Sequence, residues 1–186
     1  PPLAGKVIDF IACELGLPPF REPAMLQATL WLAEFRRGAA DAVKKEADPD
    51  AMFVYEQMVR LCPEPDMNGI LDALQRRATL TRDWQIFLDR SPVLLCPVSG
   101  ELPFPDLLDV ESPDAFDRVM EAQLTQVGLP LMGLPGLTVS TGITEGNIPV
   151  GVQLIGGRYR EDTLLAAGEV IEAGGVPALP VDPQAN

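Results

Sequence analysis

The residue types available for catalysis are limited first by the absence of histidine from this chain of 186 residues. Mechanisms in which histidine activates a serine or cysteine, or binds a catalytic metal, are therefore excluded within the chain. The serines are Ser91, Ser99, Ser112 and Ser140, and the lysines are Lys6, Lys44 and Lys45. No serine lies in a Ser-Ser or Ser-Gly-Gly neighbourhood, and the lysines lie in polar or unplaced contexts. The sequence therefore predicts no nucleophile with a base beside it.

Ser99 and its neighbours come closest to a functional pattern. Ser99 follows an apolar run and lies in a proline-rich loop, where it either lines a ligand pocket or hydrogen-bonds its own backbone. Cys96 lies at the end of that run, and nothing beside it lowers its pKa, so packing is its expected role. Glu101, Asp106 and Asp109 lack the spacing of a calcium loop and are expected to face solvent. No metal site is predicted.

The composition excludes several classes of partner. The net charge of −13 argues against binding to nucleic acid or to anionic membranes. No apolar run is long enough to span a bilayer, and the N-terminus lacks a signal-peptide pattern. Cys13, Cys62 and Cys96 form neither a disulfide framework nor a metal-ligand spacing, which favours a reducing cytoplasm. The pair Gly156-Gly157 is not part of a phosphate-binding motif, so no nucleotide cofactor is expected either.

The elements that would position these residues follow from apolar periodicity and from capping residues. Asp66 and Ser112 are suitable N-caps, and Trp31 and Trp84 are assigned to the core. An α/β fold is predicted, with a mixed sheet whose strands are covered on both faces by helices. Residues 1–20 are not placed, and residues 21–186 are expected to form the C-terminal part of one α/β domain. Helices are expected near 24–37, 51–61, 66–89, 113–127 and 161–173, and strands at 93–96, 137–141 and 150–155.

Two segments carry a resemblance to a known family. GLPGLTVSTG (133–142) and IPVGVQLIGGRYREDTLLAAGEVIEA (148–173) resemble the C-terminal end of the amidase signature family. FLDRSPVLLCPVSGELPFP (87–105) resembles the strand and proline-rich loop that contribute to that family's substrate pocket. The matching positions are Gly133, Pro135, Pro149, Val150, Gly151, Gln153, Gly156, Glu161, Leu164 and Leu165. The resemblance implies an amidase-type hydrolase of carboxamide or related acyl C–N bonds.

The catalytic part of the family pattern is missing from this sequence. In the family, a lysine and a cis serine activate a nucleophilic serine within a Gly-Ser-rich tract, and the chain has no such tract. The chain is therefore expected to be the C-terminal part of an amidase, without its catalytic N-terminal half, and to be inactive alone. It also has Cys96–Ser99 in place of a Thr-rich tract, and Pro130 where asparagine is frequent.

The resemblance and the position of the proline-rich loop together predict site residues and partners. Pro97, Val98 and Ser99 are expected to border the substrate pocket, together with Pro130 and Met132. The expected partners are a small amide substrate in the complete enzyme and either a complementary N-terminal chain or a second copy, because sheet strands this apolar need cover. A non-catalytic binding module and an oligomerisation scaffold are the alternatives.

Overall fold

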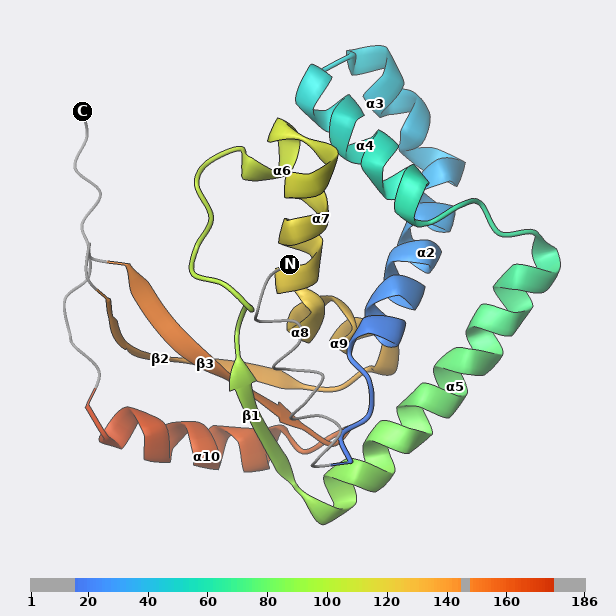
Figure 1. The fold of residues 1–186 in the computed structure, drawn as a ribbon. Helices are drawn as coiled ribbons and strands as arrows, with labels where there is room; N and C mark the ends of the chain where they lie inside the picture. The colour runs from blue at the N-terminus through green and yellow to red at the C-terminus, as the bar shows by residue number, and fades with distance from the viewer. Residues whose placement is uncertain (1–15, 145–147, 176–186) are drawn as a thin grey trace.

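The computed structural model describes residues 16–144 and 148–175 and shows a helix-rich α/β fold with a small sheet (Figure 1). The predicted fold class is confirmed. In chain order the elements are α2 (Arg21–Gly38), α3 (Ala40–Glu46), α4 (Pro49–Leu61), α5 (Met67–Arg90), β1 (Val93–Pro97), α6 (Leu108–Glu111), α7 (Pro113–Ala122), α8 (Leu124–Val127), α9 (Leu129–Met132), β2 (Gly136–Ile143), β3 (Pro149–Gly156) and α10 (Glu161–Ala173).

The sheet has the strand order β1-β3-β2, and both pairs are antiparallel. The expectation of a mixed sheet is wrong for these three strands. β1 and β2 run in the same direction, as the helical crossover α6–α9 between them requires. However, β3 returns from the β2 hairpin and inserts between them, so no parallel pair forms among the described strands.

Helices pack against both faces of the sheet, but they cover its strands unevenly (Figure 1). On one face α10 contributes Leu164 to a cluster with Val139 and Leu154. On the other face Ile155 joins the main core with Trp84 and the residues of α9. The predicted cover is therefore confirmed for the C-terminal half of β3. It is wrong for β1, an edge strand whose Leu95 is 58% exposed.

Capping residues start the helices where the sequence predicts. The Asp66 carboxylate accepts a hydrogen bond from the Gly69 amide at 2.7 Å, and the Ser112 hydroxyl accepts one from the Ala115 amide at 3.1 Å. These bonds satisfy first-turn amides that have no partner within the helix. The helix at 161–173 is confirmed with the predicted bounds.

The single helix predicted at 113–127 is instead broken at Gln123 into α7 and α8. The Ala122 carbonyl accepts a hydrogen bond from the Gly100 amide at 2.7 Å, and the Gln126 amide donates to the Gln123 carbonyl instead. The bond that would continue the helix through this point is therefore replaced by a contact with the loop after β1.

A second, smaller core joins α2 to α4 and contains Ala28, Leu32 and Cys62. The prediction that both tryptophans lie in the core is right for Trp84, which has no exposed surface and belongs to the main core. It is wrong for Trp31, which is 48% exposed. Residues 39–50, expected from their polar sequence to be a surface excursion, are mostly exposed but largely helical, and Ala40 is buried. Within the described residues, no helix has the length and hydropathy to cross a membrane.

Candidate functional site

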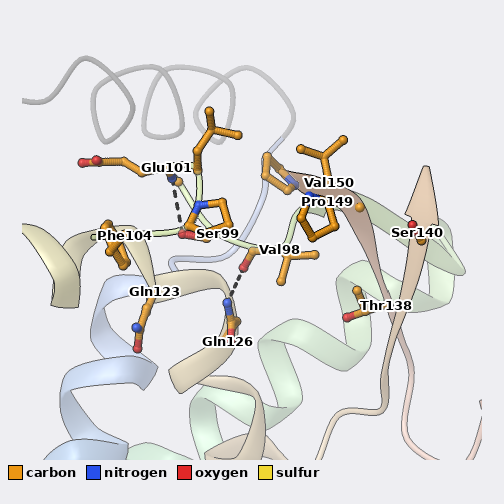
Figure 2. Close-up of a pocket in the computed structure, with 15 residues that line it drawn as sticks. Val98, Ser99, Glu101, Phe104, Gln123, Gln126, Thr138, Ser140, Pro149 and Val150 are labelled. Atoms are coloured by element: carbon orange, nitrogen blue, oxygen red, sulfur yellow. Dashed lines mark hydrogen bonds between the residues drawn. The ribbon is translucent and has the colours of Figure 1, made fainter. Parts of the chain in front are cut away.

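A cavity of about 810 Å³ lies between the loop after β1, the α7–α8 junction and the β2–β3 hairpin (Figure 2). The loop provides one wall and the sheet provides another. The lining residues are Pro97, Val98, Ser99, Gly100, Glu101, Leu102, Pro103, Phe104, Gln123, Gln126, Thr138, Ser140, Pro149, Val150 and Gly151. This volume is within the range of small-molecule sites.

The loop that forms the first wall is held by hydrogen bonds to the α7–α8 junction. The Val98 carbonyl accepts from the Gln126 side-chain amide at 2.6 Å (Figure 2). It also accepts from the Thr125 hydroxyl at 2.9 Å. The Gly100 amide donates to the Ala122 carbonyl in the same region. The position of the wall is therefore set by contacts between segments more than twenty residues apart.

Both interpretations of Ser99 describe part of its environment. Its side chain lines the cavity, and its hydroxyl also bonds to nearby backbone. The hydroxyl donates to the Ala122 carbonyl at 3.3 Å and accepts from the Glu101 amide at 3.3 Å. No described lysine or carboxylate is hydrogen-bonded to this oxygen, so nothing in the described structure would take its proton.

Glu101 is the charged residue of the described cavity lining, and its charge is balanced. Its carboxylate accepts hydrogen bonds from the Arg118 guanidinium, with Nε 3.0 Å from Oε1. The hydrogen bond from Arg118 lowers the pKa of the Glu101 carboxyl, and the Coulombic attraction of Arg118 adds to this effect. The rest of the described lining is uncharged, with hydroxyl and amide groups at Thr138, Ser140 and Gln123.

Cys96 and Gln153 are register partners on β1 and β3, outside the cavity lining, and have structural roles. Burial raises the pKa of the Cys96 thiol to about 11, which supports the predicted packing role. The Gln153 side chain is 6% exposed and donates to the Thr125 carbonyl at 2.8 Å. It thereby ties the central strand to α8, whose Thr125 also holds the loop.

Three of the five predicted site residues line the cavity, and two do not. Pro97, Val98 and Ser99 line the cavity, whereas Pro130 and Met132 do not. Met132 is buried in the main core, and Pro130 is exposed on the one-turn helix α9. Within the described residues, no group of three or more cysteine, aspartate or glutamate side chains gathers as potential metal ligands.

Several residues that line the cavity were not predicted from the sequence. Thr138 and Ser140 alternate with apolar residues along β2, and this period of two places them on one face of the sheet. The signal was therefore present in the sequence. Gln123 and Gln126 had no comparable signal, because their contribution depends on the break between α7 and α8.

The chain is similar in sequence to a known family of proteins. A family model described as Amidase matches residues 52–165. The chain is 33% identical over 108 residues to an indoleacetamide hydrolase from Bradyrhizobium japonicum, covering 58% of the chain and 23% of that protein. It is 35% identical over 100 residues to a glutamyl-tRNA(Gln) amidotransferase subunit from Roseiflexus sp. (strain RS-1), covering 54% of the chain and 20% of that protein. The chain thus spans about a fifth of the length of the curated relatives it matches.

Solved structures show the same fold. A crystal structure of an amidase superposes with a TM-score of 0.63 at 24% identity, covering 84% of this chain and 36% of the other. The allophanate hydrolase of Kluyveromyces lactis superposes with a TM-score of 0.61 at 18% identity, covering 84% and 26%. The family match spans more than half of the chain and includes all three strands and the described cavity. The chain therefore belongs to the amidase family.

Proposed function

We propose that this chain provides the C-terminal sheet and one wall of the substrate pocket of an amidase-type hydrolase, which cleaves a carboxamide or a related acyl C–N bond. The observation that carries the proposal is the cavity of about 810 Å³ enclosed by the proline-rich loop and the β2–β3 hairpin. Both segments belong to the region that matches the family model.

The residues that line the cavity indicate which part of the reaction this chain contributes. Amide hydrolysis needs a nucleophile, a base and donors for the oxyanion. Among the described lining residues there is no lysine, and Ser99 is hydrogen-bonded to backbone. The chain is therefore proposed to position substrate, while the nucleophile and base come from a Gly-Ser-rich tract outside this sequence.

The cavity walls favour a neutral substrate with an apolar acyl group. Val98, Leu102, Phe104 and Val150 offer apolar surface, and the Glu101 charge is balanced by Arg118. A charged substrate would lose hydration without gaining a partner from the described lining. Indoleacetamide, the substrate named for one relative, is a neutral aromatic amide of this kind.

An assay of phenylacetamide hydrolysis tests the catalytic part of the proposal. We expect no rate above background with the chain alone, and activity when a Ser/Lys-bearing N-terminal half of an amidase is added. In the active assembly Val98→Trp should narrow the substrate range toward smaller amides, because Val98 lines the cavity. Pro130→Trp is the control, because Pro130 is exposed and outside the cavity lining.

Two results would contradict the proposal. Hydrolysis by the isolated chain that Ser99→Ala abolishes would place the nucleophile in this sequence. An unchanged substrate range in Val98→Trp would remove the loop from the substrate pocket. A non-catalytic binding module is the second candidate, favoured by the backbone hydrogen bonds of the Ser99 hydroxyl. It predicts that phenylacetamide binds but is never hydrolysed, whichever catalytic half is added.

A further inference from the structure

A second cavity, of about 470 Å³, lies among α2, α4 and the segment that starts α6. It shares no lining residue with the cavity beside the sheet. We call it the α2–α4 groove and define it by Trp31, Phe35, Asp50, Tyr55, Leu107 and Asp109. Its size suits a small molecule, and its residues have no role in the proposed amide chemistry.

Aromatic side chains form much of the groove wall. The rings of Phe35 and Tyr55 have centroids 5.7 Å apart with planes tilted by 38°. Trp31 lines the same groove and leaves 48% of its surface exposed. This solvent exposure is unusually high for a tryptophan side chain. Aromatic faces attract organic cations through the ring quadrupole and also provide apolar contact area.

The charged groups of the groove are all negative. Asp50 and Asp109 line it, and neither carboxylate forms an ion pair with a described residue. The described lining contains no lysine or arginine. Lys44 contacts Tyr55, with Nζ 5.9 Å from the ring centroid, but it is not part of the groove lining. An occupant with one positive charge would therefore find two partners and no competing cation in the described lining.

The backbone of Leu107 adds to the construction of the groove. This residue has φ of 58°, a left-handed conformation that a bulky side chain rarely adopts. Its side chain lines the groove and remains 55% exposed. This strained position thus presents a large apolar side chain to the groove that Asp109 also lines.

We propose that the α2–α4 groove binds a small organic ammonium ion with an apolar, preferably aromatic, body. The aromatic walls receive the body, and the two carboxylates attract the ammonium group. An anion would be repelled by both carboxylates, and a neutral molecule of equal shape would gain only the apolar contact.

Tryptophan fluorescence of the full chain tests the proposal, because the two tryptophans differ in environment. Trp31 lines the groove, whereas Trp84 has no exposed surface. We expect 2-phenylethylammonium to produce a saturable change in emission that is absent in Trp31→Phe. The neutral analogue 2-phenylethanol should bind at least about threefold more weakly, and phenylacetate should give no saturable change.

Matched variants separate the effect of the groove carboxylates on binding affinity from the effect of the net charge of the chain. Asp50→Asn and Asp109→Asn should each weaken binding of 2-phenylethylammonium by about two- to fivefold. Asp106→Asn makes the same change in charge at an exposed acid outside the groove lining and should leave the affinity unchanged. Circular dichroism of each variant confirms that the fold is retained.

The proposal is overturned by any of three results: no saturable change with the ammonium ion, equal affinity for 2-phenylethanol, or an Asp106→Asn effect as large as that of Asp109→Asn. Competition by phenylacetamide that is stronger than competition by 2-phenylethanol would also overturn it, because a preference for the amide would place the ammonium ion in the cavity beside the sheet. None of these results depends on catalysis.

Discussion

Gly151 brings β3 so close to β2 that a Cβ atom at this position would lie 2.7 Å from the carbonyl oxygen of Val139. That atom belongs to the backbone of the neighbouring strand, so it cannot rotate away as a side chain would. Gly151 also lines the cavity beside the sheet. Its small size therefore serves both strand pairing and the shape of the site.

The Gly151→Ala substitution should lower the free energy of unfolding by about 1–3 kcal/mol, because the added methyl group forces the strands apart. Urea denaturation followed by circular dichroism measures the change. Gly142→Ala in the same hairpin is the control, since its Cβ would lie 3.8 Å from Val150 in ordinary contact. Equal losses of stability in the two variants would contradict the close-approach explanation.

Cys96 shows how burial determines the chemistry of a single side chain. Its thiol pKa rises from 9.0 to about 11, mainly through desolvation. The thiolate fraction at pH 8 should therefore be about a hundredfold lower than for an unperturbed thiol. We expect iodoacetamide to label Cys96 slowly in the folded chain and at least tenfold faster in urea, as measured by peptide mass spectrometry. Rapid labelling without denaturant would show that the thiol is exposed or activated.

At the scale of elements, the cavity depends on the junction between α7 and α8. This junction engages both the loop after β1 and the central strand β3. Thr125 is shared by both contacts: its hydroxyl holds the Val98 carbonyl, and its own carbonyl accepts from Gln153. The cavity-lining loop and the central strand are thus fixed to each other through one residue.

Gln153→Met should destabilise the chain by about 1–3 kcal/mol, because it leaves the buried carbonyl of Thr125 without the Gln153 donor. Gln126→Met is the matched control. It also removes a side-chain donor, but the Val98 carbonyl keeps its bond from Thr125, so the loss should be below about 0.5 kcal/mol. Chemical denaturation of both variants gives the comparison. A larger loss in Gln126→Met would contradict this account of the junction.

At the scale of the whole molecule, apolar surface remains uncovered at one edge of the sheet and on α10. Leu95 on the edge strand β1 is 58% exposed, and Leu165 and Val170 on α10 are exposed as well. An unpaired strand edge is a template for pairing with another chain. These features support the expectation that the chain associates with a complementary chain or with a second copy.

Sedimentation velocity at micromolar concentration tests this association. We expect species larger than the 20.1 kDa chain, or binding of an apolar dye to uncovered surface. The net charge of −13 opposes self-association, so a partner chain of different sequence is favoured, and added salt should increase homotypic association. A single monodisperse 20.1 kDa species that binds no dye would contradict the expectation.

What the sequence determined by itself about this protein is mostly local. The Asp66 and Ser112 caps, the β2–β3 hairpin and the bounds of α10 follow from neighbouring residues. Each depends on hydrogen bonds or apolar periodicity within a few positions, which can be read along the chain. The family resemblance likewise rests on short contiguous motifs.

The tertiary structure alone decided the features that depend on distant contacts. Gln123 interrupts a helix because the Gly100 amide takes the Ala122 carbonyl, and Trp31, which belongs to none of the described core clusters, remains exposed. β3 separates β1 from β2, which turns an expected mixed sheet into an antiparallel one. Local propensity contains no information about which distant segment will supply a hydrogen bond or a covering side chain, because that choice is made by the packing of the whole fold.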